Sequence, residues 1–170
     1  MNKASVARRL ATYGLLIAVA FLFSYIEALL PLSLGIPGVK LGLANLAVVL
    51  TMALLSRREA WVVALVRILL VGFTFGNPYS MLYALCGGVC SVAVMSLLWN
   101  SRRLSVLGIS MAGALAHNIG QLLFAAAVTE TARLWWYLPL LLISGAVTGG
   151  LIGAAALAVL RRFSKVKRTI

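Results

Sequence analysis

The sequence predicts an all-α integral membrane protein, a single domain over residues 1–170 with about six transmembrane helices. Hydrophobic residues make up 63% of the chain and charged residues only 11%, whereas soluble domains carry about 25% charged residues. Apolar runs of about 20 residues, long enough to cross a bilayer as helices, recur along the sequence. A soluble domain of this length has no room to bury so much apolar surface, so we expect apolar side chains to face lipid.

Six apolar runs follow one another along the chain. The first comes after Lys3, Arg8 and Arg9; at about 21 residues it exceeds the apolar region of a secretory signal peptide, and we expect a retained helix. Glycine and proline separate the first two runs, and Gly76-Asn77-Pro78 ends the third. The predicted helices cover residues 10–30, 42–56, 60–76, 79–99, 105–128 and 136–160.

The basic residues predict the orientation of this domain in the membrane. With six spans, the basic clusters at the N-terminus, after the second helix, after the fourth helix and at the C-terminus all lie on one side. Cytoplasmic loops collect Lys and Arg, so we expect a multi-pass protein of the cell membrane with both termini in the cytoplasm. Only Lys40 and Arg133 lie in the opposite loops. Five or seven helices would distribute the clusters over both sides.

Polar side chains of the predicted helices gather toward the outer half of the bundle. His117 and Gln121 lie four residues apart and so share a helix face. Because polar groups are costly in lipid, they usually face the bundle interior or a cavity, which predicts a pocket open to the outside. Hydrogen bonds across helices are the structural alternative for each amide. The predicted ligand-binding residues are Lys40, Asn45, Arg67, Asn77, His117, Asn118 and Gln121.

Arg67 lies inside the third predicted helix. An arginine at the centre of a membrane helix costs about 2.5–3.5 kcal/mol even on the mildest insertion scale. One interpretation is a structural ion pair or a side chain that reaches toward the membrane surface. The other is a counter-charge at the floor of the pocket for an anionic ligand, with Lys40 and Arg133 at the rim. Glu27 is the acidic residue near this pocket and a candidate partner for Lys40.

Small residues recur at roughly four-residue spacing on two helices, a pattern that lets helices approach closely. The first helix carries Ala7, Ala11, Gly14 and Ala18, and the sixth carries Gly145, Gly149 and Gly153. Packing within the chain is one interpretation of such stripes. Docking of another membrane subunit is the other, for which Gly14 and Ala18 are the candidate residues.

Signatures of catalysis are missing from the sequence. No P-loop pattern occurs, so we expect no ATPase activity from this chain. Its acidic residues, Glu27, Glu59 and Glu130, lie too far apart in sequence to predict a carboxylate site for magnesium and diphosphate. Cys86 and Cys90 lie in an apolar run and indicate small buried side chains. We therefore expect no catalytic residue, metal or cofactor, and we attribute the net charge of +12 to membrane topology and not to nucleic-acid binding.

The segment from Pro37 to Leu46, PGVKLGLANL, resembles the bacterial Gx transporter family, also known as heptaprenyl diphosphate synthase component I. The resemblance extends over nearly the whole chain, including the Gly76-Asn77-Pro78 break and the stretch 116–121. The Lys-Leu-Gly-x-Ala-Asn element is also similar to one in the S components of energy-coupling-factor vitamin transporters. That similarity implies an S-component-like bundle that binds a vitamin from outside and docks through helix 1 onto a coupling transmembrane subunit with ATPases.

Three functions follow as hypotheses. The leading one is the substrate-binding membrane subunit of an energy-coupling-factor-type importer for a small, partly anionic vitamin or cofactor precursor. The alternative is a non-catalytic membrane component of heptaprenyl diphosphate synthase in menaquinone side-chain biosynthesis, because prenyl synthases use Asp-rich magnesium motifs and this chain has no Asp. The third is a structural subunit of a membrane redox complex. The expected partners are membrane lipids, a small molecule from outside and a coupling subunit with ATPases, without nucleic acid.

Overall fold

The computed structural model describes residues 3–29, 42–101 and 103–162, and these residues form helices without any strand. The predicted all-α class is confirmed. The observed helix ends lie within three residues of the predicted ones, except that the first helix begins at Lys3 instead of residue 10. The elements are α1 (Lys3–Leu29), α2 (Leu43–Leu54), α3 (Arg57–Thr74), α4 (Pro78–Leu98), α5 (Val106–Thr129), the 3-10 helix η1 (Ala132–Tyr137) and α6 (Leu138–Arg162).

Four of the described helical segments are long and apolar enough to cross a membrane. They are Val6–Leu29, Pro78–Leu98, Val106–Thr129 and Ala132–Arg162. The α2 helix is apolar but has only 12 residues, and α3 carries four charged side chains among its 18 residues. The bundle therefore combines four segments with the dimensions of a membrane span and two shorter or more polar helices, whereas the sequence predicted about six transmembrane helices.

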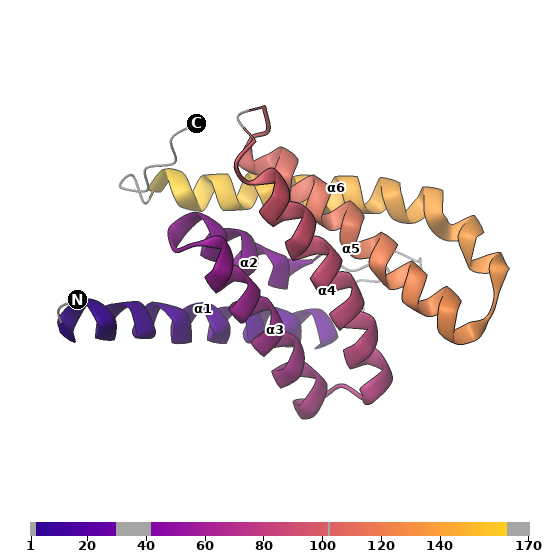
Figure 1. The fold of residues 1–170 in the computed structure, drawn as a ribbon, viewed down its shortest axis with the longest axis horizontal. Helices are drawn as coiled ribbons and strands as arrows, with labels where there is room; N and C mark the ends of the chain where they lie inside the picture. The colour runs from indigo at the N-terminus through magenta and orange to yellow at the C-terminus, as the bar shows by residue number, and fades with distance from the viewer. Residues whose placement is uncertain (1–2, 30–41, 102, 163–170) are drawn as a thin grey trace.

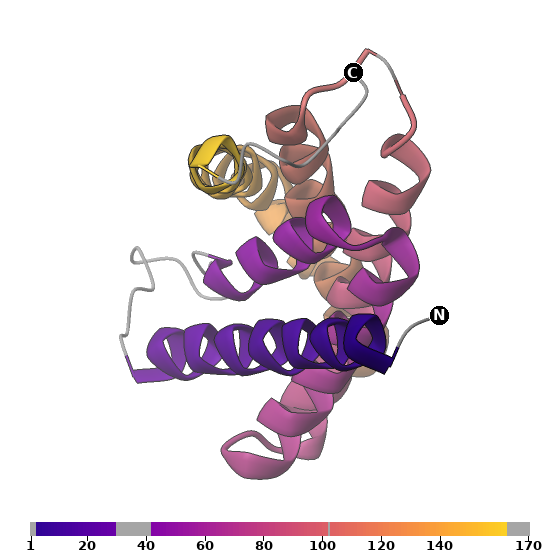
Figure 2. The same ribbon diagram turned by 90° about the vertical axis from the view of Figure 1, so that its left-hand side faces the viewer.

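The six helices contact one another as a closed ring in the order α1, α3, α4, α5, α6 and α2. In Figure 1, α6 runs across the upper part and α1 lies below it at the left, with the short α2 between them. Figure 2 shows α6 end-on and α2 again between α6 and α1. Since α2 contacts both of these long helices, it closes the ring that α3, α4 and α5 complete on the other side.

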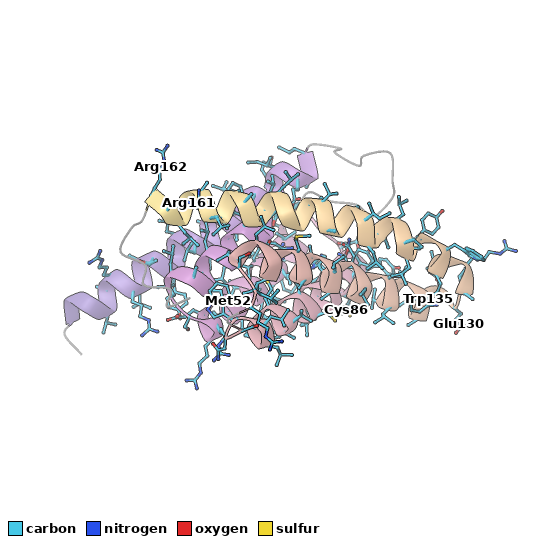
Figure 3. The ribbon with its side chains drawn as sticks, turned by 90° about the horizontal axis from the view of Figure 1, so that it is seen from above. Met52, Cys86, Glu130, Trp135, Arg161 and Arg162 are labelled. Carbon is cyan, nitrogen blue, oxygen red and sulfur yellow. The ribbon has the colours of Figure 1, made fainter. Side chains whose placement is uncertain are left out.

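Charged contacts lie at the end of the bundle where α1 begins. Arg9 Nε donates to Glu59 Oε1 at 2.7 Å, which joins α1 to the first turn of α3. Arg57 Nη1 donates to the carbonyl of Ser96 near the end of α4 at 3.2 Å. Arg161 and Arg162, at the end of α6, lie toward this side as well, opposite η1 and its labelled Trp135 (Figure 3). Apart from Arg67 within α3 and Arg133 of η1, the described basic side chains therefore gather at one end of the molecule.

The interior of the bundle is apolar where helices pack, and its outside is apolar too. One buried cluster includes Val48, Ala64, Val92 and Ile109, from four different helices. Many large apolar side chains nevertheless stay exposed, such as Leu97 at 80%. A soluble protein rarely leaves so much contiguous apolar surface in water, and this arrangement is that of a membrane protein.

Glycines on α6 let it approach the backbone of α5. A Cβ atom on Gly149 would lie 2.8 Å from the Cα of Met111, and one on Gly153 would lie 2.7 Å from the Cα of Leu107. Such distances leave no space for any side chain. This stripe therefore serves packing within the chain, the first of the two interpretations offered by the sequence.

The small-residue stripe of α1 lies elsewhere. Gly14 and Ala18 are exposed, and no described atom outside the helix's own turns lies within 4 Å of a Cβ placed on Gly14. Leu16 and Ala20, on the opposite face of α1, are the ones that pack against α2 and α3. The Gly14 stripe thus faces away from the bundle and is free to contact lipid or another subunit.

We expect Gly153→Ala to destabilise the fold by about 1–3 kcal/mol, because the new methyl group meets backbone atoms of α5 that cannot move aside cheaply. Thermal unfolding of the detergent-solubilised protein measures this effect. Gly14→Ala is the matched control, since it adds the same methyl group where nothing lies in its way. Equal melting temperatures for the two variants would contradict the packing described for α6.

Candidate functional site

The ring of helices surrounds a cavity of about 230 Å³ to which all six α-helices contribute. Exposed residues at the end of α1 and at the α3–α4 turn line its mouth, among them Ala28, Phe75 and Ser80. Its deepest part reaches the buried Met95 and Ile152. Because α1 starts and α4 ends near the basic side chains, the mouth lies toward the opposite end of the bundle.

Five of the seven predicted ligand-binding residues line this one cavity: Asn45, Arg67, His117, Asn118 and Gln121. They come from α2, α3 and α5, so the fold brings together side chains that are distant in sequence. Lys40 lies outside the described residues. Asn77 does not line the cavity, because it is the N-cap of α4 and its side chain accepts a hydrogen bond from the Ser80 amide at 2.8 Å. Asparagine before a first-turn proline is a typical helix start.

Arg67 projects from α3 toward α1. Its Nη1 donates to Ser24 Oγ at 3.2 Å, and Ser24 Oγ in turn donates to the carbonyl of Ala20 at 3.0 Å. Arg67 Nε is buried without a hydrogen-bond partner among the described residues. The guanidinium of Arg67 therefore makes few hydrogen bonds to the described residues, although it lies inside an apolar bundle.

Glu27, also at the cavity, holds the start of α2. Its Oε1 accepts hydrogen bonds from the Gly42 amide at 2.5 Å and from the Leu43 amide at 3.1 Å. A carboxylate at a helix N-terminus satisfies free N–H groups and interacts favourably with the helix dipole. Gly42 has a positive φ of 74°, a conformation that glycine adopts without strain. The candidate partner of Glu27, Lys40, lies outside the described residues.

The polar face of α5 forms another wall. Asn118 Nδ2 donates to the carbonyl of Leu141 at 2.7 Å, which is the bond across helices that the sequence offered as an alternative for this amide. Gln121 is only 5% exposed and packs with His117 against Gly87 of α4, where a Cβ would lie 2.6 Å from Gln121 Cγ and 2.9 Å from His117 Cε1. Gly87 therefore positions both side chains.

Hydroxyl side chains line the deeper part of the cavity, and sequence reasoning missed them. Ser110 Oγ donates to the carbonyl of Gly149 at 2.8 Å, and Thr148 Oγ1 donates to the carbonyl of Ser144 at 2.9 Å. Ser91 Oγ is buried without a hydrogen-bond partner among the described residues. Serine and threonine within apolar runs were the available signal, since small polar residues of that kind mark helix contacts in membranes.

The lining groups are suited to binding. One guanidinium, one carboxylate already bound to backbone amides, the imidazole, amides and hydroxyls surround a space large enough for a small molecule or a polar head group. The described residues hold no group of three or more His, Cys, Asp or Glu side chains that could bind a metal ion. A few placed polar groups in a partly apolar cavity are typical of ligand sites.

We expect Gly87→Ala to displace the imidazole of His117, because the added methyl group would overlap with the ring. His117 is the single histidine of the chain, so its resonance in a histidine-labelled, untagged protein needs no further assignment. The prediction is a changed imidazole chemical shift in a folded protein. Gly88→Ala is the control, since its methyl group meets the flexible end of Ile68 and leaves the resonance in place; equal spectra for both variants would contradict the geometry.

One family matches the sequence, heptaprenyl diphosphate synthase component I, over residues 16–159. This range runs from α1 to α6 and contains every described cavity residue named above. No curated protein and no solved structure matches the chain. The match confirms the family resemblance of the sequence and supports the synthase alternative more than the importer hypothesis.

Proposed function

We propose, because the chain belongs to the heptaprenyl diphosphate synthase component I family, that it is the non-catalytic membrane component of such a synthase. The family match over most of the chain is the observation that carries this proposal. The apolar helices hold the component in the membrane, and the reaction itself takes place on a partner protein.

The positions of the acidic side chains support a non-catalytic role. Glu27 binds the start of α2, Glu59 pairs with Arg9, and Glu130 is the exposed residue that ends α5. Magnesium and diphosphate chemistry requires several oxygen ligands that converge on the metal. Three carboxylates placed on separate contacts favour a catalytic centre in another subunit.

The charge distribution supports an orientation with both termini in the cytoplasm of the cell. The basic end of the bundle then faces the cytoplasm, as Lys and Arg usually do. The aromatic residues of η1, including Trp136 at 86% exposure, lie at the opposite interface, a depth that Trp and Tyr favour. A soluble catalytic partner would meet the basic face, and the cavity would receive a small molecule from the other side.

A second candidate is the substrate-binding membrane subunit of an energy-coupling-factor-type importer. The observation that favours it is the position of the cavity mouth, away from the basic end. The ligand contacts would be the predicted set, with Arg67, Asn45 and the polar residues of α5 in the cavity wall. The exposed Gly14 and Ala18 of α1 would dock the coupling transmembrane subunit.

Affinity purification of the tagged chain from its native membrane separates the two candidates. We expect a soluble Asp-rich prenyl synthase to co-purify, and deletion of the gene to remove the long-chain prenyl product. Gly14→Leu with Ala18→Leu is the informative variant, since it blocks docking on α1 and leaves the basic face intact. Capture of a coupling subunit with ATPases, lost in this variant, together with an unchanged prenyl product would contradict the synthase proposal and support the importer.

Cysteine labelling tests the orientation. In a Cys86→Ala, Cys90→Ala background, we expect Trp136→Cys to react in intact cells with a maleimide that cannot cross membranes. Arg162→Cys should react only after the membrane is permeabilised, because α6 carries it to the cytoplasmic side. The reverse pattern would place the basic end outside and would overturn the proposed topology.

A further inference from the structure

Arg67 is the guanidinium of the cavity wall, and it has capacity for hydrogen bonds that the described protein does not use. Of its five N–H donors, one is accounted for, by the 3.2 Å bond from Nη1 to Ser24 Oγ. The Nε–Nη2 edge makes no hydrogen bond to a described residue, and its Nε atom is buried. This edge presents two parallel N–H donors and can form paired bonds with a carboxylate or phosphate.

Glu27 is the opposite charge that acts on Arg67, but it is bound elsewhere. Its Oε1 accepts from the amides of Gly42 and Leu43. Within the described part of the chain, the ion pair of Arg9 with Glu59 is the one salt bridge that forms, so Arg67 and Glu27 both line the cavity without direct contact. The carboxylate stabilises α2, and the guanidinium remains available.

Ser91 is a second, independent sign of a ligand in the same cavity. It is 1% exposed, lines the cavity, and its Oγ has no hydrogen-bond partner among the described residues. A buried polar group without a partner costs about 1–3 kcal/mol. The side-chain amides of Asn45 and Gln121, on the same cavity, make no hydrogen bond to other described residues. Several hydrogen-bonding groups therefore line the same cavity as this guanidinium.

We propose that the cavity binds a small molecule through an oxyanion, a carboxylate or a phosphate, held by the free edge of Arg67. This inference rests on the proposed function only in treating the cavity as a small-molecule site. The cavity of about 230 Å³ lies below the usual range of about 300–1,000 Å³ for ligand pockets. It accommodates a compact anion or the anionic head of a longer molecule whose remainder extends through the mouth.

The test uses purified full-length protein in lipid nanodiscs with three probes: inorganic phosphate, inorganic diphosphate and succinate. Calorimetric titration and thermal unfolding report binding. We expect at least one probe to bind and to raise the melting temperature, and the probe that does so distinguishes phosphate chemistry from carboxylate chemistry. Arg67→Gln should weaken that binding at least tenfold. Arg58→Gln is the matched control, because it removes the same charge from an exposed position of α3.

Arg67→Lys keeps the proposal testable if Arg67→Gln does not fold. Lysine retains the charge but not the paired donors, so we expect intermediate affinity with a native melting temperature in the absence of probe. Binding that stays equal in native protein, Arg67→Lys and Arg58→Gln, or the absence of binding by all three probes, would overturn the anion site. Co-purification with a prenyl synthase is a separate measurement on the same Arg67 variants. Its loss or persistence tests the proposed function and does not test the anion site.

Discussion

Polar side chains inside an apolar helical domain must be kept away from hydrocarbon, and the ring order of the helices achieves this. The closed sequence of contacts from α1 through α3, α4, α5 and α6 back to α2 turns the amides of α2 and α5 and the guanidinium of α3 toward one shared interior. The large apolar side chains remain outside. A lipid-facing guanidinium or amide would cost several kcal/mol, so the cavity and the fold are consequences of the same requirement.

The close contact of α5 and α6 determines the shape of this interior. Gly149 and Gly153 bring the backbone of α6 against Met111 and Leu107 of α5, and Ser110 Oγ bonds to the carbonyl of Gly149 across that contact. Hydroxyl-to-carbonyl bonds between helices are a common device in membranes. The wall that carries His117 and Gln121 is therefore supported from behind by α6 and from the front by Gly87 of α4.

Most of the fold follows from patterns that the sequence shows directly, because helix length, helix breaks and basic clusters depend on nearby residues. The Asn77-Pro78 start of α4 is one example. The shared cavity of Asn45, Arg67 and the polar residues of α5 was predicted on a different ground, the cost of polar groups in lipid. Contacts between distant elements were beyond this reasoning. Nothing near Glu59 indicates that Arg9 is its partner, and nothing near Glu27 indicates that it caps α2. The helix α2 ends at Leu54 instead of the predicted residue 56, because Ser56 already caps the start of α3.

The short α2 helix is not long enough to cross a bilayer by itself. Twelve residues span about 18 Å as an α-helix, against about 30 Å of hydrocarbon in a typical bilayer. No described residue of α2 is exposed, and the helix packs against α1, α3 and α6. Hydrocarbon therefore meets the longer helices around α2, and a helix too short to cross the bilayer is tolerated because its backbone is enclosed by protein.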